Sequence, residues 1–327
     1  LALEKETAKT YPAELATRVL DAHAPGSLTL VVLNQVARAQ AVFRALDKLP
    51  EADAVDRVLV HSRFRPAERR QLRARLSESI PPEGRIVVAT QAVEAGVDIS
   101  ARVLFTELAP WPSLVQRFGR CNRYGEWSDE QCRVHWIDIT EPRECAPYEP
   151  ETLNLAREIL GDLSDGGLTT LESIADPTPA GLTQVIRRRD IVDLFDTTPD
   201  LAGNDIDISP FIRESDDSDV SVLWRDLSDE TAEDLAPSPD ELCPVRLPAF
   251  RDFLAVAQKR ESPCRIWDGL NRRWAPLYRD DLRPGIVVLV DVRGGGYDPR
   301  LGWSPDVREA APVVTATDAA VQAPPVE

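Results

Sequence analysis

Short apolar runs alternate with amphipathic stretches along the first 150 residues of the chain. The runs, rich in valine, leucine and isoleucine, are residues 28–33, 58–60, 86–89, 102–106 and 132–139. Runs of this length and composition are typical of buried parallel strands. Residues 35–49 and 66–79 carry helical patterns, and the second begins with a proline, which suits the first turn of a helix. The alternation predicts an α/β fold with a parallel sheet flanked by helices, whose ligands line the carboxyl ends of the strands.

The pattern changes after residue 150. Residues 151–163 predict a helix, and residues 203–241 form an acidic stretch with little periodicity, which is typical of a linker or a loop-rich insertion. Beyond it we expect a small α+β or β-rich C-terminal module with a hairpin turn at Asp268-Gly269. Its expected helix covers residues 249–258, and its expected strands cover residues 264–267, 271–277 and 286–290. The expected division of the chain is therefore 1–150, 151–241, 242–309 and a linker tail over 310–327.

Polar residues follow the predicted strand 86–89. Thr90 and Gln91 lie where this strand gives way to a loop, the usual place for ligand groups in an open α/β sheet. Gly96 permits a turn with positive φ, and the Asp98 carboxylate that follows can accept a hydrogen bond from a ribose hydroxyl or from an arginine. Taken singly, Asp98 can equally be a turn or cap residue.

A second polar group lies in residues 116–123, Gln-Arg-Phe-Gly-Arg-Cys-Asn-Arg. The spacing of Gln116, Arg120 and Arg123 predicts a single stripe on one face of a short helix. Two planar guanidinium groups that grip phosphate oxygens, with a glutamine able to orient a water, suit the stabilisation of a γ-phosphoryl group. The alternative is an ordinary solvated basic helix face.

Together these segments resemble a known family. Residues 90–98 (TQAVEAGVD) resemble motif V, and residues 116–123 resemble motif VI, of the second RecA-like lobe of superfamily 2 helicases. Residues 29–34 and 58–64 are similar to motifs IV and IVa. Residues 122–125 and 61–64, together with residues 188–207, 219–225 and 295–303, resemble the CRISPR-associated helicase-nuclease of type I interference systems, subtype U or G.

The resemblance implies roles for individual residues. The implied catalytic residues are Gln116, Arg120 and Arg123; the implied nucleotide-binding residues are Gly96, Asp98 and Arg117; and the implied nucleic-acid-binding residues are His61, Ser62, Arg63, Thr90 and Gln91. It also implies ATP with Mg²⁺ as cofactor, single-stranded DNA as substrate and a Cascade-type surveillance complex as partner. The intact relative is expected to translocate 3′ to 5′ on the displaced strand and to degrade it with an HD nuclease domain.

Several motifs of the intact family are absent from this sequence. There is no Gly-x-x-x-x-Gly-Lys-Ser/Thr loop, no acidic magnesium box and no His-Asp dipeptide. The chain also contains no methionine, so we expect a fragment that supplies half of an ATPase site and is inactive alone. The first RecA-like lobe and the nuclease domain with its divalent metal are expected in other sequence. The alternatives are a non-catalytic nucleic-acid-binding lobe and a general superfamily 2 helicase outside CRISPR defence.

Composition adds limits to this interpretation. The net charge of −17 is concentrated between positions 190 and 241, which hold 17 acidic residues against two arginines. An arginine cluster over residues 57–75 can still track a phosphate backbone, although an exposed helix face explains it equally well. No apolar run is long enough for a membrane span, and five cysteines without a Cys-x-x-Cys pair favour reduced thiols over disulfides or zinc. We expect a cytoplasmic protein with no membrane contact and no metal site of its own.

Overall fold

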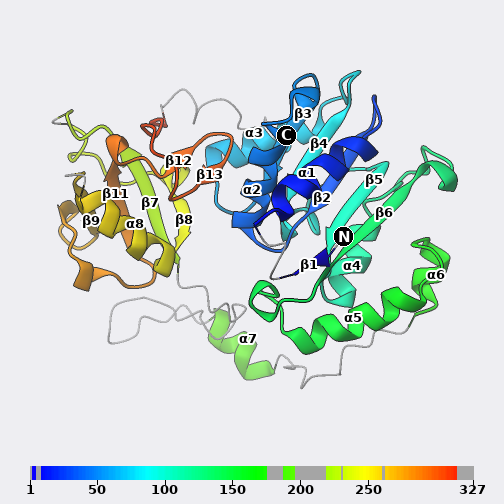
Figure 1. Cartoon of the computed structure of the whole chain (residues 1–327). Coiled ribbons are helices and arrows are strands. Elements are labelled where there is room, and N and C mark those ends of the chain that lie inside the picture. Colours follow the sequence, from blue (N-terminus) through cyan, green and yellow to red (C-terminus); the bar gives the residue numbers. More distant parts are fainter. Residues whose placement is uncertain are drawn as a thin grey trace, which may run out of the picture.

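The computed structural model describes residues 2–4, 9–174, 187–195, 219–229, 231–259 and 262–314. Within them the chain forms two parts that lie side by side, an N-terminal lobe and a C-terminal module (Figure 1). Each part has its own hydrophobic core.

The N-terminal lobe is built on a six-stranded sheet in the order β1-β6-β5-β2-β4-β3, and every neighbouring pair is parallel. The strands are β1 Ala2–Leu3, β2 Leu28–Val32, β3 Asp56–Val60, β4 Arg85–Ala89, β5 Val103–Glu107 and β6 Arg133–Ile139. All five residues of β2, of β4 and of β5 are buried, as their continuous apolar composition predicted. The predicted RecA-like parallel sheet is confirmed, with the five expected strands within two residues of their predicted positions; β1 was not predicted.

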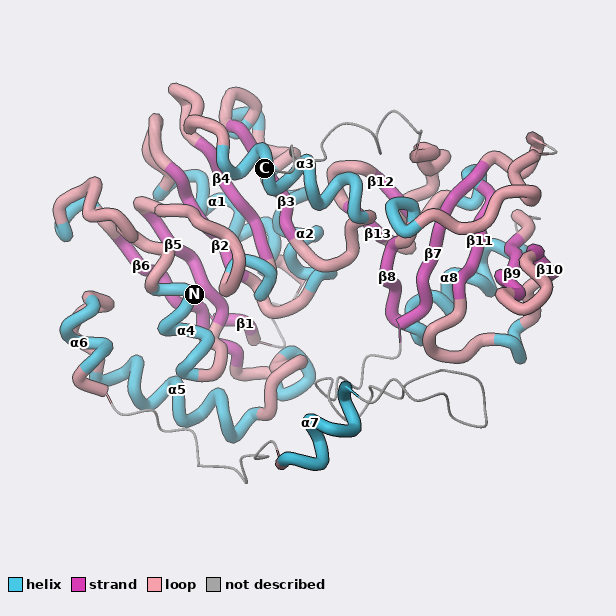
Figure 2. Tube along the Cα trace, turned by 180° about the vertical axis from the view of Figure 1, so that it is seen from behind, coloured by secondary structure: helices cyan, strands magenta, loops and turns pink. Residues whose placement is uncertain are grey.

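Helices flank this sheet. They are α1 Tyr11–Ala22, α2 Val36–Leu46, α3 Pro66–Ser77, α4 Trp111–Phe118, α5 Pro150–Asp162 and α6 Leu168–Glu172. Helices α1 and α2 pack against each other on one face of the sheet, and α4 packs against β5 and α5 (Figures 1 and 2). A proline at the first or second position of α1, α3, α4 and α5 suits the helix start, where the backbone N–H has no intrahelical acceptor.

The predicted extent of one helix was wrong. Helix α4 ends at Phe118, so Arg120 and Arg123 do not continue its face as the spacing suggested. The chain leaves the helix at Gly119 and forms a parallel bridge between Cys121 and Ala101. Two backbone hydrogen bonds fix this turn: the Ala101 N–H donates to Arg120 at 2.8 Å, and the Asn122 N–H donates to Ala101 at 2.8 Å.

The C-terminal module contains a five-stranded sheet in the order β10-β9-β11-β7-β8. Its elements are β7 Asp219–Arg225, β8 Cys243–Arg246, α8 Leu247–Lys259, β9 Cys264–Asp268, β10 Arg273–Pro276, β11 Val287–Asp291, β12 Tyr297–Asp298 and β13 Gly302–Trp303. Strands β9 and β10 form the expected antiparallel hairpin. Strands β12 and β13 form a separate two-stranded hairpin that lies between the module and the lobe (Figure 2).

The boundaries expected after residue 150 need one correction. Strand β7 lies inside the stretch expected to be a linker, yet it pairs with β8 and β11 in the module sheet, so the module includes Asp219–Arg225. Its alternating pattern is masked in the sequence by the surrounding aspartates. The start of the expected tail also has structure, because Ala311 is buried and its N–H donates to Val292 at 2.9 Å. The remaining expectations for residues 196–218 and 315–327 lie outside the described residues.

Candidate functional site

The carboxyl ends of the lobe strands meet at one edge of the sheet, and the predicted site residues gather there. The Thr90 N–H donates to the carbonyl of Val60 at 3.1 Å, which joins the end of β4 to the end of β3. Gln91 begins a short 3-10 helix, Gln91–Val93, and its amide donates to the carbonyl of Asn34 at 3.0 Å. Thr90 is 4% exposed. The prediction that these two residues lie at a strand-to-loop junction is confirmed.

The loop after this 3-10 helix carries the second predicted pair. Gly96 has φ +72°, and a Cβ at that position would meet nothing within 4 Å, so glycine is needed there for the backbone conformation and not for space. The Asp98 side chain is 71% exposed, and its carboxylate lies 3.0 Å from Nε of Arg123. Of the two partners expected for Asp98, the structure has the arginine.

The two candidate finger arginines have different environments. Arg120 is buried, and its guanidinium donates to the carbonyls of Val93 at 3.1 Å and Glu94 at 2.8 Å. Burial, and then the neighbouring charge of Arg123, lower the pKa of Arg120, although a guanidinium stays charged in proteins. Arg123 is about two-fifths exposed and has only the exposed Asp98 as an acidic partner among the described residues. Gln116 is exposed on α4.

Arg117, which the resemblance placed at the nucleotide, is fully buried in the lobe. Its guanidinium donates to Glu94 at 2.9 Å, to the Thr106 hydroxyl and the Glu107 carbonyl at 3.0 Å each, and to the Asn34 side chain at 3.0 Å. All three of its nitrogens have acceptors inside the protein. The structure therefore gives Arg117 a joining role between the loop after β4, the end of β5 and the end of β2.

A buried carboxylate lies beneath this junction. Glu107 is 0% exposed, and it accepts two hydrogen bonds from Arg38 at 2.7 and 2.8 Å, one from the Tyr11 hydroxyl at 3.0 Å and one from the Asn34 N–H at 2.6 Å. A buried carboxylate is stable only when it is paired and hydrogen-bonded in this way. Burial, with the charge of Glu107, raises the pKa of Tyr11, so its hydroxyl stays a donor.

Sequence reasoning missed several of these residues. The missed residues are Tyr11, Arg38, Glu94, Glu107, Tyr124 and Tyr148. A signal for Glu107 was present, because a lone carboxylate that ends an apolar strand must find a cation. Tyr124 is exposed beside the arginines, and a hydrogen bond to Asp98 raises its pKa. Tyr148 receives hydrogen bonds from Gln91 at 3.2 Å and Arg117 at 3.4 Å, and only the tertiary structure brings it there.

The residues predicted after β3 face the C-terminal module. His61 is buried, and its Nε2 donates to the carbonyl of Leu301 at 2.9 Å. Arg63 is buried and forms an ion pair with Asp219 of β7. Of the three predicted nucleic-acid residues in this loop, Ser62 alone is exposed. The side chains of His61 and Arg63 are therefore not free to reach a phosphate backbone in this conformation.

Much of the arginine cluster over residues 57–75 is neutralised within the protein. Arg57 lies 2.9 Å from Asp47, Arg70 lies 2.7 Å from Asp240, and Arg65 and Arg75 pair with Glu68 and Asp56. The pair of Arg70 again joins the lobe to the C-terminal module. Of the two interpretations of this cluster, the ion pairs favour a structural surface over a continuous phosphate track.

No described helix is long and apolar enough to cross a membrane. All five cysteines are free thiols, and burial raises the pKa of Cys121, Cys243 and Cys264 to about 12. Among the described residues, no group of three or more His, Cys, Asp or Glu side chains is arranged to hold a metal ion.

The fold defines the class of protein, an α/β lobe with a RecA-like parallel sheet. The arginine-bearing turn and the loop after β4 lie at the carboxyl edge of this sheet. Residues 25–126 match the family model described as "CRISPR-associated nuclease/helicase Cas3, C-terminal". Residues 25–126 are thus similar to the C-terminal helicase region of Cas3 proteins.

Curated Cas3 proteins are also similar to part of this chain. The CRISPR-associated helicase Cas3 of Thermoproteus tenax is 31% identical over 137 residues, which cover 41% of this chain and 22% of that protein. The putative nuclease/helicase Cas3 of Myxococcus xanthus is 33% identical over 147 residues, which cover 43% of this chain and 19% of that protein. The chain thus spans about a fifth of the length of these relatives.

The architecture is also similar to a solved structure. The crystal structure of T. fusca Cas3-AMPPNP superimposes with a TM-score of 0.54 at 19% identity, covering 93% of this chain and 41% of that one. Because the match extends over both parts of the chain, it supports the fold of the C-terminal module as well as that of the lobe.

Proposed function

We propose that this chain supplies the second RecA-like half of an ATP-dependent single-stranded DNA translocase that acts in type I CRISPR interference. The observation that carries the proposal is the turn after α4, which holds Arg120 and Arg123 beside the loop 91–98, at the same edge of the sheet as Thr90. Relatives named as nuclease/helicase Cas3 support the helicase activity.

The residues at this edge fit the triphosphate of ATP. Arg123 and Asp98 are both partly exposed, so a phosphate oxygen can replace the carboxylate without leaving a buried charge unpaired. Arg120 and Arg123 would hold the γ-phosphate, Gln116 would orient a water, and the loop at Gly96 and Asp98 would lie near the ribose. Bound ATP with Mg²⁺ supplies the free energy of phosphoryl transfer. A related solved protein was crystallised with AMPPNP.

Arg117 has a different part in this proposal. Its three nitrogens donate to Glu94, Asn34, Thr106 and the backbone of Glu107, so it holds the loop after β4 against the strand ends. This fixes the position of the loop carbonyls that accept hydrogen bonds from Arg120. We therefore assign Arg117 to the positioning of the nucleotide-binding loop.

Single-stranded DNA is proposed to cross the lobe at the exposed Ser62 and at Gln91, next to the buried Thr90. A hydroxyl and an amide at strand ends can hold phosphates without reading bases, so the sequence specificity would come from the guide complex. A solved neighbour described as "CRISPR RNA-guided surveillance complex, pre-nicking" supports such a partner; it matches with a TM-score of 0.50 at 16% identity. The nuclease step and its divalent metal would belong to another part of the intact cytoplasmic protein.

The decisive test replaces Arg123 by lysine in the intact protein. A point-like ammonium cannot reproduce the bidentate fork, so we expect Arg123→Lys to lower the ATP turnover by about 10³-fold or more while DNA affinity is kept. Steady-state ATPase assays with saturating single-stranded DNA measure the first quantity, and fluorescence anisotropy measures the second.

Arg18→Lys is the matched control, because Arg18 is an exposed arginine of α1 that pairs with Glu14 in the same helix. Its ATP turnover should equal that of the unchanged protein. If Arg123→Lys retained near-normal turnover, the arginine would have no role at the γ-phosphate and the proposal would be wrong.

A further inference from the structure

The β12–β13 hairpin of the C-terminal module binds the loop that follows β3, here called the strand-end loop (residues 61–65). The Trp303 N–H donates to the carbonyl of Arg63 at 2.8 Å, and the Leu301 carbonyl accepts from Nε2 of His61 at 2.9 Å. From α2, the Gln40 amide donates to the carbonyls of Leu301 at 2.8 Å and Trp303 at 2.7 Å. Backbone groups of the hairpin thus bind the Arg63 carbonyl and the His61 ring of the strand-end loop.

The fit between hairpin and loop leaves no room for a side chain at Gly302. A Cβ there would lie 2.5 Å from the Arg63 carbonyl oxygen and 2.7 Å from Cε1 of His61, and Gly302 has φ +68°. Glycine is therefore required both for the left-handed backbone and for the close approach of the two chains.

The other end of the loop is held by side chains of the module. Arg63 pairs with Asp219, and the Sγ of Cys243 lies 3.4 Å from the Arg63 carbonyl. The Arg65 N–H donates to the Tyr297 hydroxyl at 3.1 Å, and its guanidinium lies 4.2 Å from the centre of the Tyr297 ring. The C-terminal module therefore contacts both ends of the strand-end loop, at His61 and at Arg65.

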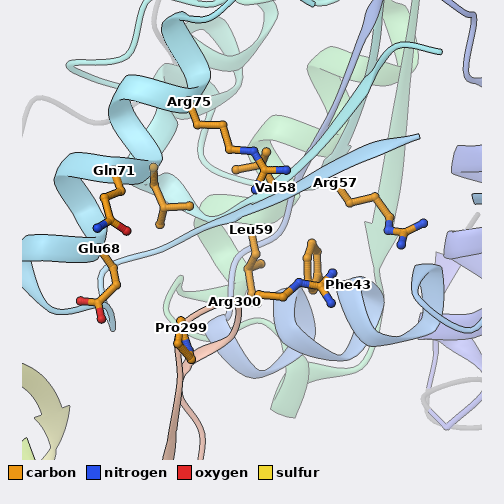
Figure 3. A pocket seen from close by; sticks show the side chains of 10 residues that line it. Phe43, Arg57, Val58, Leu59, Glu68, Gln71, Arg75, Pro299 and Arg300 are labelled. Atoms are coloured by element: carbon orange, nitrogen blue, oxygen red, sulfur yellow. The ribbon is translucent and has the colours of Figure 1, made fainter. Parts of the chain in front are cut away.

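The tip of the hairpin forms a separate contact with the lobe. Arg300 lies 3.0 Å from Asp47 and 5.3 Å from the centre of the Phe43 ring. Figure 3 shows Pro299 and Arg300 beside Phe43, Leu59 and Gln71, where they line a pocket of about 180 Å³. The arginines of this pocket have acidic partners in Asp47 and Asp56, so the pocket itself does not define an anion site.

The strand-end loop is coupled to the predicted DNA-binding edge by one hydrogen bond of the sheet. Val60 ends β3, and its carbonyl accepts from the Thr90 N–H at 3.1 Å. A displacement of residues 61–65 therefore moves the exposed Ser62 directly and disturbs the position of Thr90.

We propose that the β12–β13 hairpin is a positioning element, which holds the strand-end loop in the conformation that binds single-stranded DNA. This inference rests on the proposed function. Gly302, Leu301 and Gln40 are positioning residues in it, because they act through His61 and Arg63 and not by contact with the nucleic acid. The C-terminal module thereby becomes a determinant of DNA affinity in the lobe.

The test replaces Gly302 by alanine in the intact protein. The added methyl group has to push the hairpin away from the Arg63 carbonyl, so we expect at least a tenfold loss of affinity for a fluorescent oligo-dT strand, measured by anisotropy. The DNA concentration for half-maximal ATPase should rise by the same factor. The turnover at saturating DNA and the ATPase without DNA should stay unchanged, which general unfolding would not allow.

Gly285→Ala is the matched control. Gly285 also has a left-handed φ of +79°, but a Cβ there would meet nothing within 4 Å, so this variant introduces the backbone strain without the displacement. Its DNA affinity should equal that of the unchanged protein. Equal DNA affinities for the two alanine variants would overturn the proposal.

A second variant covers the case in which Gly302→Ala does not fold. Gln40→Met keeps the volume of a side chain that is 4% exposed but removes both of its hydrogen bonds to the hairpin. A several-fold loss of DNA affinity is expected, and unchanged affinity in a folded Gln40→Met protein would overturn the proposal. If the proposed function itself were wrong, the unchanged protein would bind no single-stranded DNA. This outcome differs from unchanged affinity in the variants, which would overturn only the role of the hairpin.

Discussion

At the scale of single residues, three arginines within seven positions have three different environments. Arg117 is enclosed by acceptors in the core, and Arg120 donates to two backbone carbonyls. Arg123 is partly exposed and contacts the exposed Asp98 and the Gly119 carbonyl. Since a guanidinium presents a rigid fork of donors, the position of its acceptors decides whether it supports the fold or remains available to a ligand. Burial thus separates the structural arginine from the one that is most accessible to a phosphate.

Arg117→Met tests the structural role. The substitution removes the cation from a fully buried position and leaves Glu94 without its ion partner, so we expect a loss of about 3 kcal/mol or more in the free energy of unfolding. Urea unfolding followed by circular dichroism measures this loss. Arg18→Met is the control, because its pair with Glu14 is exposed and is worth about 1 kcal/mol or less. Similar small losses in both variants would contradict the assignment.

At the scale of elements, the strand-end loop is shaped by the hairpin that packs on it. The His61 ring stacks on Phe64 with centroids 4.4 Å apart, accepts from the Arg63 N–H at 3.1 Å and donates to Leu301. Both ring nitrogens are thus satisfied in the neutral form. Burial, together with the charge of Arg63, lowers the pKa of His61 to about 4.

This environment predicts a dependence of stability on pH. The pKa of a histidine in an unfolded chain is about 6.5, so between about pH 6.5 and 4 the unfolded state binds more protons than the folded state. The contribution of His61 to stability is therefore complete above about pH 6.5 and is lost as the pH falls toward 4. The shift of His61 to about 4 corresponds to a loss of about 3 kcal/mol.

Urea unfolding of the isolated chain at several pH values checks this expectation. Because carboxylates also titrate in acid, the comparison is with His61→Asn, whose stability should fall less steeply between pH 6.5 and 4. His135→Asn is the comparison, since burial also lowers the pKa of this histidine of β6, but less than that of His61, so its loss should flatten the slope less. The expectation is wrong if all three proteins lose stability in parallel.

At the scale of the whole molecule, the N-terminal lobe and the C-terminal module contact each other along one interface. The lobe carries the arginine-bearing turn, whereas the module holds the strand-end loop through hairpin, ion-pair and aromatic contacts. The sequence has no phosphate-binding Gly-x-x-x-x-Gly-Lys-Ser/Thr loop. In the proposed function, this lobe completes an ATPase site, and another lobe would hold the remaining phosphates.

The isolated chain should therefore show no ATPase activity above background, even with single-stranded DNA. A coupled assay that detects phosphate release measures this, with the intact protein as the positive control. Turnover by the isolated chain that Arg120→Ala abolishes would contradict the half-site interpretation, because it would require a complete site within these residues.

The sequence by itself determined the lobe. Short apolar runs that alternate with amphipathic helices favour a parallel sheet covered by helices, and polar residues at the carboxyl ends of its strands then share an edge. Thr90 and Gln91 were placed correctly on this basis, because a strand and the residue that follows it are a local pattern. The C-terminal hairpin β9–β10 was predicted for the same reason.

Only the tertiary structure decided what each polar side chain does. The bridge of Cys121 to Ala101 ends the arginine stripe after Phe118. The acceptors around Arg117 come from four separate strands or loops, and Asp219 reaches Arg63 across 156 positions of sequence. Strand β7 was likewise assigned to a linker, because it lies in an acidic stretch and only its pairing with β8 and β11 identifies it as a strand. Local periodicity reports which face a residue lies on, whereas the pairing of a charge depends on groups that only folding brings near.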